Sequence, residues 1–176
     1  RERLVDELAD DVVPAIGECA TTEGVAALAA RLADRRTAPS AAVALARSSR
    51  GAARDALTGL LAKPASELGG DRGEAVALAG IVRALALGDT LPGLEAHLDA
   101  MVKGAAPSAS ELAAFGLVAL GMRSVSEVLE AKPSSVSEES WWGAAGRGAL
   151  ARGPGEREVL ARAYLARVVA RGTSAE

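Results

Sequence analysis

Side chains able to do nucleophilic or metal chemistry are few in this chain. Among 176 residues there is one histidine, His97, and one cysteine, Cys19. Ser-His-Asp and Cys-His catalysis both need a histidine oriented by another group. The carboxylates nearest to His97, Glu95 and Asp99, lie two positions away, where they do not share its helix face. We therefore expect His97 to be an ordinary surface or groove-edge residue and Cys19 to be a small buried side chain.

Metal and phosphate sites have equally little support. One histidine and one cysteine cannot form a His/Cys metal cluster. The acid pairs Asp10–Asp11 and Glu138–Glu139 are adjacent in sequence, so their members point about 100° apart on a helix. The glycine run at 143–148 has no strand before it and no Lys-Ser/Thr after it, unlike a phosphate-binding loop. The sequence predicts no catalytic residue, no metal and no cofactor, and we expect a protein that is not an enzyme.

The adjacent pair Trp141 and Trp142 is the feature that best fits binding. Aromatic residues are only 2% of the chain, and two of them stand together behind the segment Ser137-Glu138-Glu139-Ser140, which can supply the cap of a helix. Neighbouring helical positions cannot both face one core. We expect one tryptophan to pack on the preceding helices and the other to be partly exposed. An exposed tryptophan is a natural binding anchor, whereas a packed one needs a partner for its indole N–H.

The elements that must position these residues are helices. Three segments, 84–94, 118–129 and 150–160, each show an apolar run ending in glycine, a short turn and a second apolar run. The glycines are Gly88, Gly121 and Gly153, at intervals of 33 and 32 residues. A period of this length is typical of a helical solenoid. The chain is also rich in alanine, the strongest helix former.

Apolar periodicity extends this pattern to helical pairs along residues 1–171, as a single domain, with a frayed tail at 172–176. The approximate pairs are 3–36, 40–63, 74–103, 110–132 and 138–171. Residues 65–73, with three glycines, are predicted to form a flexible joint. Ser108 or Ser110 is expected to cap the fourth pair. Because large aromatics are scarce, helices should approach closely at their internal glycines, which are Gly80, Gly116, Gly143 and Gly146.

A family resemblance rests on the junction from Leu87 to Leu94, which reads Leu-Gly-Asp-Thr-Leu-Pro-Gly-Leu, and on a weaker version from Leu120 to Leu129. This junction resembles that of HEAT-like repeats of the phycobilisome-lyase type, with Asp89 as its usual acidic residue. The resemblance implies an all-α fold, a right-handed α-α superhelix (HEAT-like solenoid) of about five helical pairs, whose second helices line a concave groove. The charged groove residues it implies are Arg31, Arg35, Arg54, Glu95, Asp99, Lys103, Glu127, Glu130, Arg157, Arg162 and Arg167.

The charge and the composition of the chain limit the classes of partner that we expect it to bind. The net charge is −3, with basic segments at 31–63 and 147–171 and an acidic segment between them. An acidic middle and few aromatics argue against nucleic acid as the partner. No run reaches the ~18 apolar residues of a membrane span. The chain begins at Arg1 without Met, so we expect a trimmed piece of a longer, cytoplasmic protein.

The leading hypothesis is a non-enzymatic scaffold that binds a protein or peptide partner through its groove or an end face. The candidate binding residues are Trp141, Trp142, Arg54, Glu95, Asp99, Glu127, Arg157 and Arg162. Self-association through the apolar last helix is a related expectation. Two alternatives stay open. One is an accessory, lyase-like factor for chromophore attachment or protein modification; the other is a HEAT-like protein that acts on DNA bases.

Overall fold

The computed structural model describes residues 22–32, 34, 36–48, 51–68, 70–104 and 106–173. All regular secondary structure in these ranges is helical, with no strand, so the predicted all-α class is confirmed for them. The helix expected at 3–19 with Cys19, together with Arg35, lies outside the described residues. Within the described ranges, no helix combines the length and apolar character needed to cross a bilayer.

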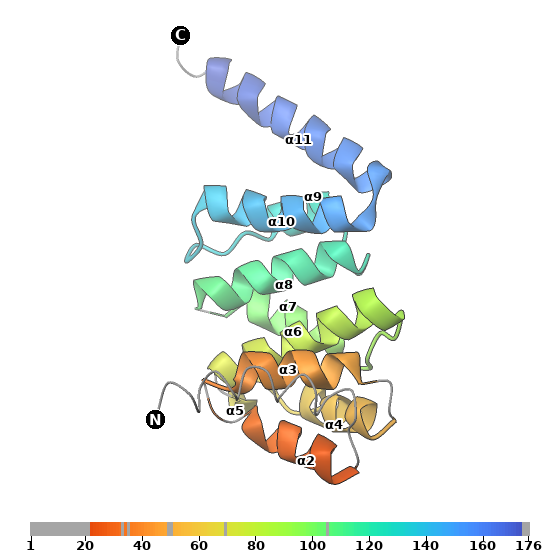
Figure 1. Ribbon diagram of the computed structural model, residues 1–176. Coiled ribbons are helices and arrows are strands. Elements are labelled where there is room, and N and C mark those ends of the chain that lie inside the picture. Colours follow the sequence, from red (N-terminus) through yellow and green to blue (C-terminus); the bar gives the residue numbers. More distant parts are fainter. Residues whose placement is uncertain are drawn as a thin grey trace, which may run out of the picture. The chain divides into compact units, whose positions relative to one another are not determined.

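The helices follow one another with short connections (Figure 1). In chain order they are α2 (Thr22–Arg31), α3 (Ala38–Arg47), α4 (Gly51–Leu61), α5 (Ala65–Leu68), α6 (Gly70–Leu87), α7 (Leu94–Val102), α8 (Pro107–Ala119), α9 (Val125–Glu130), α10 (Glu138–Arg152) and α11 (Pro154–Thr173). They form two compact units, residues 1–97 and 98–176, whose boundary falls within α7.

The three periodic glycines are the residues at which helices end. Gly88, Gly121 and Gly153 follow α6, α8 and α10, and their φ angles are +65°, +71° and +139°. Side chains other than glycine rarely adopt this backbone region, which is why glycine commonly terminates helices. The repeated sequence pattern therefore predicted the helix–turn–helix junctions correctly, because each junction needs a glycine with positive φ.

In the unit of residues 1–97, α3 lies against α2 and α6, and α4 contacts α2, α3 and α6. Its core consists mainly of alanine and leucine, with Leu45, Leu57 and Ile81 fully buried. The close approach expected at Gly80 is present. A Cβ added there would lie 2.7 Å from Cδ1 of Leu94, so α6 has room for α7 only because position 80 lacks a side chain.

A buried arginine holds the α6–α7 junction of this unit. Arg83 donates from Nε to Oδ2 of Asp89 over 2.6 Å and from Nη1 to the carbonyl of Ser48 over 2.6 Å. Arg54 donates to the other carboxylate oxygen over 3.2 Å. The hydrogen bond from Arg83 is the main cause that lowers the pKa of Asp89 below its ordinary 3.8, and Arg54 adds to it. Asp89 therefore joins α4 to α6, and Arg83 joins α6 to the end of α3.

In the unit of residues 98–176, α8 runs alongside α10, and α9 contacts α8, α10 and α11 (Figure 1). The closest approach is at Gly148, where an added Cβ would lie 2.7 Å from the carbonyl oxygen of Phe115 and 2.8 Å from Cβ of Val118. Gly143 and Gly146 have only ordinary contacts at 3.5 Å. The expectation of tight packing at these two glycines was wrong, because they face away from α8.

The segment 65–73, predicted as a loop-like joint, is helical in most of its described residues. Residues 65–68 form α5, and α6 begins at Gly70. The carbonyl of Gly73 accepts a hydrogen bond from Nε2 of His97 over 3.2 Å, and Leu68 is buried beside it. At Gly73 an added Cβ would lie 3.8 Å from Nε2 of His97 and 4.0 Å from Cβ of Leu68, so this glycine lies at a packed position.

His97 itself is 4% exposed, which corrects its expected surface position. Because a carbonyl oxygen only accepts, Nε2 of His97 carries the hydrogen in its contact with Gly73. The helical position alone could not reveal this partner, since it comes from another helix 24 residues away.

The expected serine caps of the fourth pair are absent. Helix α8 begins earlier than predicted, at Pro107, with Ala106 as an N-cap that makes no side-chain hydrogen bond. Ser110 is buried within α8 and donates to the carbonyl of Met101 over 3.1 Å. Proline replaces a capping side chain here because the first-turn amide it lacks needs no partner.

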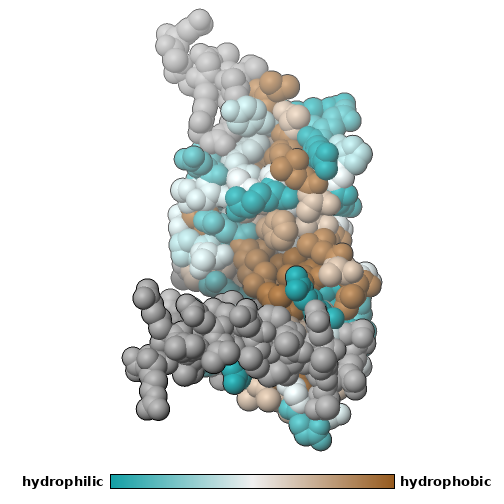
Figure 2. Space-filling model, viewed as in Figure 1, coloured by the Kyte–Doolittle hydropathy of each residue, from teal (hydrophilic) through white to brown (hydrophobic). Residues whose placement is uncertain are grey.

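Apolar side chains are exposed over part of the surface, as the brown regions of Figure 2 show. On α11, Val159, Tyr164 and Leu165 are 36%, 57% and 62% exposed. Val159 and Leu165 of the apolar arc expected on the last helix are therefore exposed, and the side chains of Val168 and Val169 lie outside the described ones.

Candidate functional site

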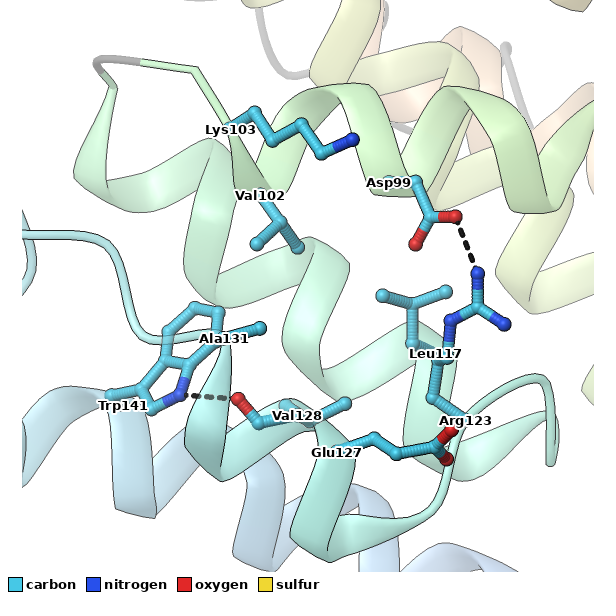
Figure 3. Close-up of a pocket in the computed structure, with 9 residues that line it drawn as sticks. All are labelled: Asp99, Val102, Lys103, Leu117, Arg123, Glu127, Val128, Ala131 and Trp141. Atoms are coloured by element: carbon cyan, nitrogen blue, oxygen red, sulfur yellow. Dashed lines mark hydrogen bonds and ion pairs between the residues drawn. The ribbon is translucent and has the colours of Figure 1, made fainter.

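A small pocket opens in the unit of residues 98–176, with a volume of about 160 Å³ (Figure 3). Helices α7, α8, α9 and α10 all contribute to its wall. The lining residues are Asp99, Val102, Lys103, Leu117, Arg123, Glu127, Val128, Ala131 and Trp141. An engineered apolar cavity of about 150 Å³ holds one benzene molecule. The pocket is therefore of a size to hold a single aliphatic or aromatic side chain.

The floor of the pocket is apolar and rigidly held. Trp141 is fully buried, and its indole Nε1–H donates to the carbonyl of Val128 over 2.8 Å (Figure 3). Leu117 and Val128 are each 2% exposed. The amide of Ser140 donates to the hydroxyl of Ser137, the N-cap of α10, over 3.1 Å, which starts the helix so that Trp141 lies in its first turns.

Charged side chains form the rim of the pocket. Arg123 donates from Nη2 to Asp99 over 2.7 Å, in a pair that is about one-third exposed (Figure 3). Glu127 accepts hydrogen bonds from the backbone amide and the hydroxyl of Ser124, at 2.8 Å and 2.7 Å. These bonds, the backbone one first, lower the pKa of Glu127, and the charge of Arg123 adds to the effect. Both rim carboxylates are therefore already hydrogen-bonded within this unit.

Lys103 lies where this pocket meets a wider depression. The depression has a volume of about 570 Å³ and is lined by Val102, Lys103, Gly104, Ala131, Pro133, Ser134 and Ser135. Lys103 is exposed, and among the described residues it makes no ion pair or hydrogen bond through its ammonium group. Lys103 is the only charged residue that lines both hollows.

The described lining of the pocket consists of apolar and charged side chains. The pocket contains no histidine, cysteine or serine side chain, and its carboxylates are bonded to Arg123 and Ser124. In the part of the chain that the structure describes, no group of three or more His, Cys, Asp or Glu residues could hold a metal ion. What remains is an apolar floor with a charged rim, which is the usual composition of a small recognition pocket.

The structure brings three of the predicted binding residues together and leaves the others apart. Asp99, Glu127 and Trp141 line the pocket. In the unit of residues 1–97, Arg54 is bonded to Asp89 and Glu95 is exposed on α7. On α11, Arg157 donates to the carbonyl of Leu150 and Arg162 pairs with Glu158.

The two tryptophans differ as expected. Trp141 packs on α9, and Trp142 is half-buried, meeting Tyr164 of α11 edge to face with centroids 6.3 Å apart. An exposed Trp141 anchor is ruled out by its burial. Trp141 instead supplies the floor of the pocket.

Sequence reasoning missed five of the pocket residues, which are Val102, Leu117, Arg123, Val128 and Ala131. One local signal was available: the spacing Ser124-x-x-Glu127 is that of a capping box, and both of its hydrogen bonds are present at the start of α9. Val128 lies one turn after the start of α9 at Val125, on the face that meets Trp141. The contribution of Arg123 depends on Asp99, which is 24 residues away, and had no local signal.

We compared the chain with protein-family models, curated proteins and solved structures, and none of them matches it. The HEAT-like resemblance therefore rests on the repeated junction alone.

Proposed function

We propose that this chain is a non-enzymatic interaction module that binds a protein or peptide partner by taking one apolar side chain into the pocket floored by Trp141. The observation that carries this proposal is the apolar pocket of about 160 Å³, with a rim of bonded charges. Burying one large apolar side chain contributes about 1.5–3 kcal/mol, which is enough for a hot spot within a larger contact surface.

We further propose that the helical pairs are HEAT-like repeats of a right-handed α-α solenoid. The support is the period of the helix-ending glycines and the pairing of helices around them. Repeats of this kind build extended binding surfaces, which agrees with an interaction role.

The interaction role is favoured over the two alternatives by the chemistry of the pocket. A modification or lyase-like factor would need an acid or a histidine free to transfer protons, whereas Asp99 and Glu127 are bonded to Arg123 and Ser124. A DNA-binding surface would carry a strong excess of basic residues, whereas this pocket has two acids and two bases.

The test is to fill the pocket. Ala131→Leu adds apolar atoms at the mouth of the pocket, from an exposed position after α9 (Figure 3). Ala151→Leu makes the same change at an exposed position of α10 that does not line the pocket, and is the matched control. Peptides are first selected from a phage-displayed random library on the wild-type protein. Their affinities for the wild type and both variants are then measured by fluorescence anisotropy.

We expect the selected peptides to bind Ala131→Leu about 10- to 100-fold more weakly, since each factor of ten corresponds to about 1.4 kcal/mol. Binding to Ala151→Leu should be unchanged. Circular dichroism establishes that both variants are folded. Failure to select any peptide, or equal binding by both variants, contradicts the proposal.

Self-association through α11 stays a prediction. Its exposed Tyr164 and Leu165 are apolar surface that a second copy could cover. Light scattering at increasing concentration should show a rise in mass for the wild type and a smaller rise for Leu165→Glu. A strict monomer at high concentration contradicts it.

A further inference from the structure

We propose that the partner segment carries a carboxylate close to its apolar anchor, and that Lys103 binds this carboxylate. The inference rests on the proposed function, because it concerns what lies next to the side chain held in the pocket. We assign the wider depression between the ends of α7 and α9 as a second subsite, which binds an acidic side chain.

Lys103 is the only cation at this place whose donors are all available. Two other cations lie nearby. Arg123 is bonded to Asp99, and Lys132 donates to the carbonyls of Pro133 and Val136 over 3.1 Å and 2.8 Å. The ammonium group of Lys103 has no such partner among the described residues. A ligand can therefore use all three of its N–H donors without breaking an existing bond.

The depression around Lys103 favours an anion. Lys103 is its only charged lining residue, so its local charge is positive. Ser134 and Ser135 also line it, and both are exposed. Within the described ranges their hydroxyls make no hydrogen bond, and a hydroxyl can donate to a carboxylate. A carboxylate in this hollow would meet one ammonium group and two hydroxyl donors.

A cationic partner group fits less well. It would have to approach Asp99 or Glu127, and these carboxylates already accept from Arg123 and Ser124. A partner cation would share carboxylates that already bind Arg123 or Ser124, whereas a partner anion meets an ammonium group with no partner among the described residues. Because Lys103 lines both hollows, an apolar side chain in the pocket places the neighbouring residues of the same peptide beside Lys103.

The experiment uses the same displayed library with charge-reversed protein. Wild-type selection should yield peptides with a large apolar residue and an Asp or Glu within a few positions of it. Lys103→Glu should weaken their binding about three- to tenfold, as expected for reversing one exposed ion pair. A peptide whose acid is changed to Lys should bind Lys103→Glu better than it binds the wild type. Lys63→Glu reverses another exposed lysine, outside this region, and should leave binding unchanged.

The outcomes separate this inference from the proposed function. Peptides that lose binding to Ala131→Leu but carry no acid, or that bind Lys103→Glu as well as the wild type, overturn the carboxylate subsite and leave the pocket proposal intact. Enrichment of basic peptides overturns it as well. If no peptide is selected at all, the proposed function fails, and the inference fails with it.

Discussion

Replacing Gly148 by alanine should destabilise the unit of residues 98–176, although alanine is the better helix former. Gly148 lies within α10 and faces α8. Its new Cβ would come within 2.7 Å of the carbonyl oxygen of Phe115, 2.8 Å of Cβ of Val118 and 3.2 Å of the amide nitrogen of Ala119. Two of these atoms belong to the backbone of α8, which cannot rotate away as a side chain would.

The two opposing effects can be estimated separately. Overpacking of a well-packed contact costs about 1–3 kcal/mol, and three contacts this short, two with backbone, place Gly148→Ala near the upper end. The gain in helix propensity from Gly to Ala is about 1 kcal/mol. The net result is a loss of about 2 kcal/mol. Gly146→Ala provides the matched control on the same helix, because its Cβ meets only Cδ2 of Leu160 at 3.5 Å.

The assay is thermal unfolding followed by circular dichroism. We expect Gly146→Ala to gain up to about 1 kcal/mol, so the two variants should differ by about 3 kcal/mol. For a chain of this length that corresponds to roughly 6–12 °C between their midpoints, with the wild type in between. If Gly148→Ala is as stable as Gly146→Ala, the close approach of α8 and α10 at this glycine is wrong.

Three further predictions concern hydrogen bonds of single side chains. Arg83→Met removes a buried charged donor to a backbone carbonyl and should lower the free energy of unfolding in urea by about 1.5–3 kcal/mol. Arg54→Met, at a 41% exposed side chain, should lower it by less than about 1 kcal/mol. Equal losses for the two variants would contradict the buried role of Arg83. Because the pKa of Asp89 is lowered in the folded state, its carboxylate stabilises the fold above the ordinary 3.8 and stops doing so as pH falls through the lowered pKa. Wild type and Asp89→Asn should therefore differ in urea midpoint near neutral pH and converge in acid, and a gap independent of pH would refute this. Ser124→Ala should cost about 1 kcal/mol through loss of the α9 cap, against almost nothing for the exposed Ser126→Ala, both read from urea midpoints.

Local chemistry explains where the sequence predictions succeeded. The glycines at 88, 121 and 153 were recognised because a helix end with positive φ selects glycine at that one position. A cap within residues 137–140 was expected for a similar reason, and the hydroxyl of Ser137 accepts from the amide only three residues ahead. The unequal burial of Trp141 and Trp142 followed from helical geometry alone.

The pocket could not be predicted in the same way. Its walls come from four helices, and its members are distant in sequence, as in the 24-residue separation of Asp99 and Arg123. Assigning side chains to a shared hollow requires the rotation of each helix to within one residue, and the repeat pattern does not supply it. The error at Gly143 and Gly146 has the same origin, because the glycine that faces α8 is two positions beyond Gly146.

The sequence by itself determined that the described chain is helical and where its later helices end, because helix propensity, apolar period and the φ of a terminating glycine all act over a few neighbouring residues. Tertiary structure alone decided that His97 is buried against Gly73 and that α8 packs closely on α10 at Gly148. It also decided that Trp141 forms the floor of a pocket that Lys103 lines. Each of these depends on which faces of separate helices meet, and that is set by packing across the chain rather than by any local residue.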